Sequence, residues 1–302
     1  MSEHIVRSPA VSIIMNCYNG ERFLNEAIES VLAQTHSDWE LIFWDNLSSD
    51  NSSAILKGYS DKRLRYFCSE SHTNLGAARK LAYEECRGEL IAFLDVDDTW
   101  EKEYLEKQVA LFIDENIGFS CANYFIRNER NGTAVRAHEG TIPSGYVLDD
   151  LLGNYFIGLL TLVVRRAALE RIGSINPNYH MIYDFDLAVK LSCEWMLASI
   201  QEPIATYRVH EYNESFSNAN LNIAELKSWR DEMSTHKIIG CSKSFAAFED
   251  KIHQTEGLKF IYEGSRFKGL TSILKSSFSI HMVSLIIATI LPLALLKKLR
   301  SL

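Results

Sequence analysis

The sequence predicts an α/β fold with a mostly parallel central sheet flanked by helices and a helical C-terminal extension. Through the first half of the chain, short apolar runs alternate with amphipathic segments. The runs lack the polar–apolar alternation of half-exposed strands, which indicates strands covered on both faces. From about residue 220 onward the pattern is helical. With 302 residues, 47% of them hydrophobic, the chain can bury a substantial core.

The elements of the first half follow from local patterns. VSIIM is an unbroken apolar run, and apolar pairs recur every four residues from Phe23 to Leu32, as in an amphipathic helix. ELIFWD ends in a polar turn, LRYFC is a further apolar run, and Gly88 stops the helix that NLG opens. The expected strands are 11–15, 40–45, 64–68, 89–95 and 117–126, and the expected helices are 21–33, 51–59, 74–86 and 101–115.

The second half begins with a polar, hairpin-like stretch, RNERNGTAVRAHEG. It continues with an apolar segment at 155–166, a helix within 180–192 that starts with acidic residues, and a strand and loop at 201–215. No internal repeat or low-complexity linker divides the chain before this point. We therefore expect one unit over 1–218 and a helical region over 219–302.

Charge is unevenly distributed. Residues 259–302 carry seven Lys and Arg against one Glu, a net charge of +6, so the −8 of the whole chain leaves −14 for residues 1–258. An acidic body argues against binding of nucleic acid through its phosphates. The basic end flanks an apolar run at 279–296, a combination that predicts contact with a membrane surface.

The run 279–296 is interrupted by His281, Ser284, Thr289 and Pro292, and a single crossing from a cytosolic body would export the basic residues behind it. An interfacial or re-entrant segment fits better, with a buried terminal helix pair as the alternative. The six cysteines lack metal or redox spacing, and no signal peptide is expected. The predicted location is the cytoplasm, peripheral on the cytoplasmic face of the inner membrane.

Polar side chains gather where the expected strands end. Tyr18, Asn19 and Asp45 follow the first two strands, and three aspartates follow the apolar strand in IAFLDVDDTW. Ligands of open parallel sheets bind beyond the carboxyl ends of the strands. Like charges this close repel one another, and a cation would neutralise them. Oxygen ligands of this kind suit Mg²⁺ or Mn²⁺ bound together with substrate phosphates.

The three aspartates can also be explained without a metal, by roles in the local structure. Asp98 can cap the helix that follows, with Asp95 and Asp97 solvated in the loop. The D-x-D tripeptide is weak evidence by itself, because it occurs by chance in many chains. Its position at the end of a buried strand favours the metal site.

Four segments in order resemble the motifs of the family 2 glycosyltransferases, which have the GT-A fold. They are VSIIMNCYNGERFLNEAIESVLAQT, LIFWDNLSSDNS, NLGAARK and IAFLDVDDTW, and the resemblance extends over about residues 10–215. It implies an inverting transferase of the bacterial surface-polysaccharide type, with a nucleotide-diphosphate sugar as donor and Mn²⁺ or Mg²⁺ as cofactor. It also implies a nucleotide-binding half at about 10–100 and an acceptor half at 101–218.

The resemblance assigns the nucleotide end of the site residue by residue. Asn16 and Tyr18 would contact the base and the ribose, Tyr18 by stacking, and Asn19 belongs to the same loop. Asp45 would accept a hydrogen bond from uracil or thymine, which favours a UDP- or dTDP-sugar. Without the family, the Asn19-Gly20 pair reads as a turn after the first strand.

The resemblance also assigns the diphosphate end. Gly76 and Arg79 match the loop and helix start that close over the nucleotide, although a lone Arg on a helix is usually a surface residue. Asp95 and Val96 match the nucleotide-binding part of the aspartate motif. Asp95 and Asp97 match the metal ligands, with Asp97 as the more direct one.

The catalytic base is expected in MIYDFDLAVKLS. Inverting transfer needs a carboxylate that takes the proton from the attacking acceptor hydroxyl. The family's base follows a glutamate at the start of a helix, which corresponds to Asp184 here, with Tyr183 in place of the glutamate. That departure leaves Asp186 open as the base. Alternatively, both carboxylates only favour the positive end of the helix.

YRVHEYNES resembles the family's closing Arg-x-His segment. His210 would complete the metal shell or contact the diphosphate, with Arg208 nearby, although a histidine in a loop is often a surface residue. The expected acceptor is a saccharide or a lipid-linked saccharide.

Two other functions have weaker support in the sequence. A sugar-nucleotide pyrophosphorylase usually opens with a glycine-rich loop and a basic residue, and VSIIMNCYNG has neither. A catalytically inactive nucleotide-sugar-binding partner in a membrane polysaccharide assembly is favoured only by Tyr183.

Overall fold

The computed structural model describes residues 9–214 and 218–276. The chain divides into two compact units. Of the described residues, the first comprises 9–147 together with Phe156–Asn213, and the second comprises Leu148–Tyr155 together with Glu214 and 218–276. A short segment from the middle of the sequence thus packs with the C-terminal helices.

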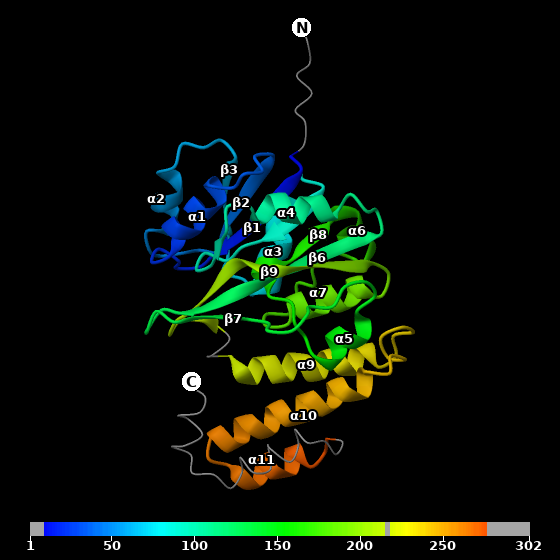
Figure 1. The fold of residues 1–302 in the computed structure, drawn as a ribbon. Helices are drawn as coiled ribbons and strands as arrows, with labels where there is room; N and C mark the ends of the chain where they lie inside the picture. Colours follow the sequence, from blue (N-terminus) through cyan, green and yellow to red (C-terminus); the bar gives the residue numbers. More distant parts are fainter. Residues whose placement is uncertain (1–8, 215–217, 277–302) are drawn as a thin grey trace. The chain divides into compact units, whose positions relative to one another are not determined.

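A mixed, mostly parallel sheet forms the centre of the first unit (Figure 1). Within the described residues its strand order is β3-β2-β1-β4-β8-β6-β9-β5, and β7 pairs with β6. β1 to β4 run parallel, as do β6 and β9, whereas β8 is antiparallel to both β4 and β6. The strands are β1 Val11–Cys17, β2 Trp39–Asp45, β3 Leu64–Cys68, β4 Leu90–Phe93, β5 Thr99–Trp100, β6 Ile117–Asn128, β7 Ala134–Arg136, β8 Val163–Arg165 and β9 Met196–Val209.

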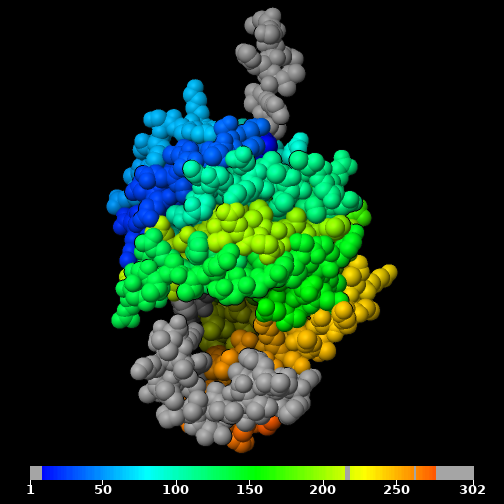
Figure 2. Space-filling model, in the orientation of Figure 1, coloured from blue at the N-terminus to red at the C-terminus, as the bar shows by residue number. Residues whose placement is uncertain are grey.

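Helices pack on both the early and the late strands. α3 contacts β1 and β2, α7 contacts β6, and α4 contacts β6 and β9. Figure 2 shows the yellow-green surface of β9 between the blue-green region of α4 and the green region of β6. The helices of the first unit are α1 Leu24–Leu32, α2 Ser52–Lys57, α3 Leu75–Glu84, α4 Tyr104–Leu111, α6 Arg166–Arg171 and α7 Tyr183–Ser192, with a 3-10 helix, η1, at Leu159–Thr161.

The predicted α/β fold with a mostly parallel sheet is confirmed. Every strand and helix expected before residue 128 is present, with ends that differ by no more than four residues. The polar stretch after β6 forms the expected hairpin with β7. β9 begins at Met196, earlier than the expected 201.

Burial explains the unbroken apolar runs. Every residue of β1 and β2 is buried, so both faces of these strands lie in the core. The buried residues of α1, which recur every three or four positions, join the same apolar cluster as β1. Each large aliphatic side chain buried in this way contributes ~1.5–3 kcal/mol relative to an exposed one.

A buried polar network holds the sheet edge at the start of β1. Ser12 Oγ donates to Glu40 Oε1 (2.6 Å), and Arg65 Nη1 donates to Glu40 Oε2 (2.7 Å). The Gly88 N–H donates to Ser12 Oγ (2.8 Å). A Cβ at Gly88 would lie 2.5 Å from the Ser12 nitrogen, so the close approach of this turn to β1 requires glycine. The network fixes β1, β2 and β3 at the edge away from their carboxyl ends.

The second unit is helical, as expected for the C-terminal region. Asp149 Oδ1 accepts hydrogen bonds from Ser242 Oγ (2.6 Å) and from the Ser244 N–H (3.2 Å), which ties α5 to the residues before α10. Within 9–214 and 218–276, no helix is long and apolar enough to span a bilayer. The predicted membrane segment 279–296 lies outside the described residues. The helices are α5 Leu148–Gly153, α9 Ala219–Met233, α10 Phe245–Tyr262 and α11 Arg266–Ile273.

Candidate active site

The carboxyl ends of β1, β2 and β4 lie at one edge of the sheet and bring the predicted residues together. In the register, Cys17 is opposite Asp45 and Ile14 is opposite Phe93. Tyr18 therefore begins a loop beside Asp45, and the aspartate motif begins next to the end of β1. This edge is where the parallel topology predicts a ligand.

The loops after β1 and β2 are joined by hydrogen bonds. The Asn19 N–H donates to Ser48 Oγ (3.0 Å), and Asn19 Oδ1 accepts from the Ser49 N–H (2.8 Å). The Glu21 N–H donates to Asp50 Oδ2 (2.9 Å). Asn19 has a φ of 54°, a left-handed conformation that asparagine adopts more readily than most residues. The predicted nucleotide residue Asn19 thus fixes the shape of the loop pair.

Asp45 is buried at the end of β2. Its Oδ1 accepts from the Ser48 N–H (2.8 Å), and its Oδ2 accepts from the Tyr66 hydroxyl (2.9 Å). Burial, together with the hydrogen bond to the Asp45 carboxylate, raises the pKa of Tyr66 to about 12. The Tyr66 hydroxyl therefore stays protonated and holds the carboxylate in place.

Tyr18 is exposed, at 54%. Its ring centroid lies 4.3 Å from that of His72, with the rings tilted by 51°. His72 Nδ1 lies 3.0 Å from the Asn46 carbonyl oxygen, which fixes the imidazole on the loop after β2. An exposed ring supported in this way can stack on a planar base. His72 was missed from the sequence; its place two residues before NLGAARK is the only signal for it.

Gly76 lets the second half of the unit approach α3. Its N–H donates to the Tyr179 carbonyl (3.1 Å). A Cβ here would lie 2.2 Å from that carbonyl oxygen and 2.6 Å from the Asn176 carbonyl oxygen. Asn74 Oδ1 caps the helix by accepting from the Ala77 N–H (2.8 Å). The start of α3 thus lies directly against the Asn176–Tyr179 turn.

Arg79 is almost fully buried and joins several predicted residues. Its Nη2 lies 2.6 Å from Asp95 Oδ1, and its Nη1 lies 3.4 Å from Asn16 Oδ1. Its guanidinium carbon lies 4.8 Å from the centroid of the Tyr183 ring. Burial lowers the pKa of Arg79, but the neighbouring Asp95 and Tyr183 outweigh it and raise the pKa overall. Arg79 is therefore a permanent buried cation and not a surface residue.

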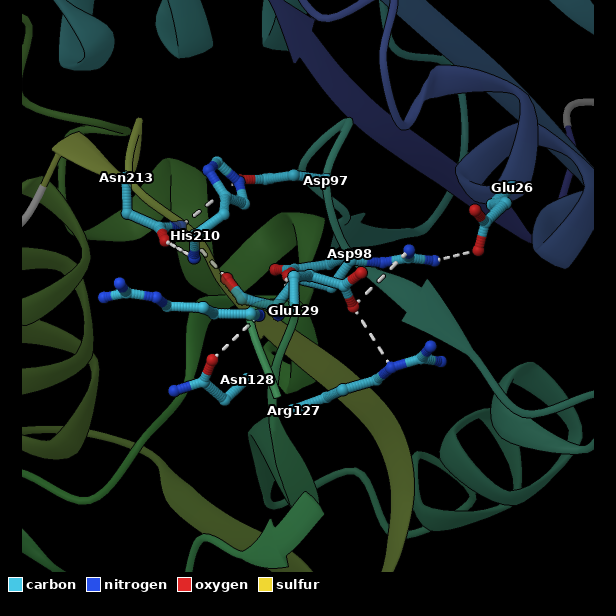
Figure 3. Close-up of polar contacts among 10 residues, drawn as sticks. Glu26, Asp97, Asp98, Arg127, Asn128, Glu129, His210 and Asn213 are labelled. Atoms are coloured by element: carbon cyan, nitrogen blue, oxygen red, sulfur yellow. Dashed lines mark hydrogen bonds and ion pairs between the residues drawn. The ribbon is translucent and has the colours of Figure 1, made fainter. Parts of the chain in front are cut away.

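The three aspartates have three different surroundings. Asp95 pairs with Arg79 and is partly exposed. Asp97 Oδ2 lies 3.0 Å from His210 Nε2 and 3.4 Å from Asn213 Nδ2 (Figure 3). Asp98 is buried, at 2% exposure, and its Oδ1 accepts from the Arg208 N–H (2.9 Å). Burial and the two neighbouring aspartates raise the pKa of Asp98 well above its usual value.

Val96, between the first two aspartates, packs against the loop after β1. A Cβ at Gly20 would lie 2.7 Å from Val96 Cγ2. The aspartate motif therefore lies against the loop that carries Tyr18.

The protein groups that could ligate a metal here fit a cation that takes most of its ligands from a bound substrate. Across the residues that the structure describes, no group of three or more His, Cys, Asp or Glu could by itself hold a metal ion. Asp97 offers a partly exposed carboxylate, and Mg²⁺ and Mn²⁺ are commonly bound by one or two carboxylates plus phosphates and water. His210 Nδ1 accepts from the Tyr212 N–H (3.2 Å), so a neutral ring carries its hydrogen on Nε2, facing Asp97. This geometry favours His210 as a hydrogen-bond donor over a metal ligand.

The two candidate bases lie in the first turn of α7 and differ in their surroundings. Asp186 is 1% exposed, and its Oδ1 lies 2.8 Å from Lys190 Nζ one turn later. Asp184 is partly exposed. A buried, ion-paired carboxylate is a structural element of the helix, whereas a partly exposed one can reach a substrate.

Tyr124 on β6 was also missed from the sequence. Burial, followed by the charges of Asp98 and Asp184, raises the pKa of Tyr124 to about 12. Its ring meets His138 edge-on, with centroids 5.9 Å apart. Its hydroxyl has no hydrogen-bond partner within 9–214 and 218–276. A phenol near both carboxylates can donate to a sugar hydroxyl.

Comparisons with known proteins indicate the family of the chain. The family described as "Glycosyl transferase family 2" matches residues 12–173. The putative teichuronic acid biosynthesis glycosyltransferase TuaG of Bacillus subtilis is 32% identical over 232 residues, covering 73% of this chain and 86% of that protein. The UDP-Glc:alpha-D-GlcNAc-diphosphoundecaprenol beta-1,3-glucosyltransferase WfgD of Escherichia coli is 38% identical over 160 residues, covering 53% of this chain and 62% of that protein.

Solved structures of low sequence identity share the fold. S. aureus TarS 1-349 in complex with UDP-GlcNAc has a TM-score of 0.64 at 16% identity and covers 87% of this chain and 89% of its own. The mannosyltransferase PcManGT from Pyrobaculum calidifontis, in complex with GDP-Man and Mn²⁺, has a TM-score of 0.60 at 15% identity, with 93% of this chain and 79% of its own covered.

Proposed function

The chain belongs to glycosyl transferase family 2, with the GT-A fold, and from that premise we propose that it is an inverting, metal-dependent transferase. It moves a sugar from a UDP- or dTDP-linked donor to a saccharide or lipid-linked acceptor. Asp184 is the general base.

The observation that carries the proposal is the contrast between the two carboxylates of α7. Asp186 is buried and paired with Lys190, whereas Asp184 is partly exposed on the same turn. Asp184 is the second residue of α7 and directly follows Tyr183, which contacts Arg79. A base at this position lies in the same cluster as the aspartate motif.

The donor is bound at both of its ends. Tyr18 stacks on the base, and Asp45, fixed by Ser48 and Tyr66, faces the polar edge of the base. WfgD is named for UDP-Glc, and TarS was solved in complex with UDP-GlcNAc; both support a uracil nucleotide.

Asp97, with Asp95 beside it, would hold Mn²⁺ or Mg²⁺ together with the donor diphosphate. The bound cation would stabilise the charge that develops on the leaving diphosphate. His210 Nε2–H donates to Asp97 or to the diphosphate. Arg79 holds the Asp95 carboxylate in place from its buried position.

Transfer is a single displacement. Asp184 takes the proton of the acceptor hydroxyl while that oxygen forms a bond to the anomeric carbon. The bond from that carbon to the diphosphate oxygen breaks on the opposite side, and the nucleoside diphosphate leaves with the electron pair. The sugar configuration is inverted.

A lipid-linked acceptor is supported by the diphosphoundecaprenol in the name of WfgD and by the apolar, basic-flanked segment 279–296. Contact of this segment with the cytoplasmic face of the membrane would keep the protein at the surface that carries such an acceptor. Deletion of residues 276–302 is expected to release the protein from the membrane fraction; retention there would contradict this part of the proposal.

The test begins with thermal shifts of the purified chain against UDP-, dTDP- and GDP-sugars, with and without Mn²⁺. A ligand of the folded state raises the melting temperature according to its affinity and concentration. The donor that stabilises most is then incubated with candidate acceptors, and the anomeric configuration of the product is read by NMR. Retention would exclude the mechanism. Failure to turn over any stabilising donor would favour the alternative that Tyr183 suggests, an inactive nucleotide-sugar-binding partner.

A further inference from the structure

We infer that Arg208 is a positioning residue that fixes the loop carrying His210 against the aspartate motif. The inference rests on the proposed function, because it concerns the diphosphate end of the same site. Arg208 is the penultimate residue of the long strand β9 and is buried, at 3% exposure.

The backbone of Arg208 is bound on both sides. Its N–H donates to Asp98 Oδ1 (2.9 Å), and its carbonyl oxygen accepts from Asn213 Nδ2 (3.1 Å). Asp98 comes directly after the predicted metal ligand Asp97, and Asn213 lies in the loop that follows β9. One residue therefore joins the aspartate motif to that loop.

The guanidinium of Arg208 contacts three side chains, of which Glu26 and Glu129 are labelled in Figure 3. Its Nη2 pairs with Glu26 of α1, and its Nη1 lies 3.8 Å from Glu129 Oε1, just past the end of β6. Its carbon lies 5.2 Å from the centroid of the Phe23 ring. Arg127 Nε lies 3.1 Å from the same Glu129 oxygen, so the charges alternate in sign across the cluster. A planar guanidinium can meet two carboxylates and an aromatic face at once, which the point charge of lysine cannot.

The His210 loop depends on these contacts. The His210 N–H donates to Asn213 Oδ1 (2.6 Å), and the His210 ring lies 4.8 Å from the Phe23 ring, centroid to centroid. Asn213 and Phe23 are both contacts of Arg208. The separation of His210 Nε2 from Asp97 Oδ2 is therefore set through Arg208 and its neighbours.

Asp98 is tied to β9 through Arg208. Asp98 is 2% exposed, and its carboxylate accepts from the Arg208 N–H (2.9 Å). Asp98 thus anchors the aspartate motif to β9.

The test uses the full chain and three variants. Arg208→Lys keeps the positive charge but loses the simultaneous contact of the guanidinium with Glu26 and Glu129. Glu129→Gln removes the negative charge of one of these two partners. Arg130→Lys is the matched control, because Arg130 is exposed in the hairpin next to Glu129. Hydrogen exchange of the peptide covering 207–214 is measured in the absence of ligand. Binding of Mn²⁺ in the presence of UDP is measured by titration of the Mn²⁺ EPR signal.

We expect faster exchange of this peptide and at least about tenfold weaker Mn²⁺ uptake in Arg208→Lys, smaller changes of the same kind in Glu129→Gln, and none in Arg130→Lys. Exchange as slow as in the wild type, or faster exchange with unchanged Mn²⁺ uptake, would overturn the inference. A uniform rise in exchange along the whole chain would also overturn it, because it indicates general destabilisation. If the wild type takes up no Mn²⁺ with UDP, the metal part of the proposed function is wrong, and the exchange of 207–214 alone decides whether Arg208 fixes the loop.

Discussion

The guanidinium of Arg79 lies 4.8 Å from the centroid of the Tyr183 ring while it also pairs with Asp95 at 2.6 Å. One buried cation therefore connects the aspartate motif to the first residue of α7. The aromatic ring occupies the position at which the family resemblance leads one to expect a glutamate. An aromatic face attracts a buried guanidinium, so the contact is kept without a second negative charge.

Substitutions of Tyr183 test this contact. Tyr183→Phe keeps the aromatic face and is expected to leave the free energy of unfolding within about 1 kcal/mol of wild type. Tyr183→Ala removes the ring beside a buried charge and is expected to cost about 3–5 kcal/mol. Urea unfolding of both variants measures the difference. Equal losses in the two variants would mean that the hydroxyl, and not the ring, makes the contact.

The two carboxylates of α7 are expected to respond differently to loss of charge. Asp184→Asn should lower kcat about 10²- to 10⁴-fold with little change in melting temperature, because it removes a proton acceptor from a partly exposed position. Asp186→Asn should leave kcat near that of the wild type and lower the free energy of unfolding by about 1–3 kcal/mol, because Lys190 loses its partner. Steady-state kinetics and urea unfolding of both variants make the comparison. The reverse pattern would assign the base to Asp186.

Gly76→Ala should disturb the junction between α3 and the Asn176–Tyr179 turn. The new methyl group would meet two backbone carbonyl oxygens, which cannot move as a side chain can. We expect a loss of about 1–3 kcal/mol in the free energy of unfolding and weaker donor binding. Gly140→Ala is the matched control, because a Cβ there meets nothing within 4 Å. Unchanged stability of Gly76→Ala would show that the turn can move away from α3.

Tyr124→Phe removes a hydroxyl that has no hydrogen-bond partner in the described parts of the chain. The melting temperature should stay the same. The value of kcat/KM for the acceptor should fall about tenfold, because one hydrogen bond to the acceptor contributes ~1.4 kcal/mol. Donor affinity, measured by calorimetry with UDP, should not change. A loss of donor affinity equal to the loss of kcat/KM would place Tyr124 at the donor instead.

Removal of divalent metal by EDTA should abolish transfer, and Mn²⁺ should restore it. Asp97→Asn is expected to weaken the activating effect of Mn²⁺ at least about tenfold, since it removes the charge that binds the cation. His210→Gln should weaken it less, because His210 faces Asp97 as a donor. Full activity in EDTA would contradict a metal-dependent mechanism.

Local sequence patterns were sufficient for the first four strands. β1, β2 and β4 are short apolar runs that become buried on both faces, whereas β3 is only partly buried and was predicted from its β-forming residues. β5 could not be predicted, because its two residues become a strand only by pairing with Thr206 and Ala205 of β9. The hydrogen bond that anchors Asp98 could not be predicted either, because its partner Arg208 lies 110 residues further along the chain. The choice between Asp184 and Asp186 required the burial of each side chain.

The paired loops after β1 and β2 have a consequence for how this enzyme can diversify. Since backbone groups of each loop are held by side chains of the other, neither can be reshaped alone without leaving donors or acceptors unmatched. A descendant that accepted a different nucleobase would have to alter Tyr18's loop and the Ser48–Asp50 turn together. Substitutions in the two loops should therefore covary in evolution.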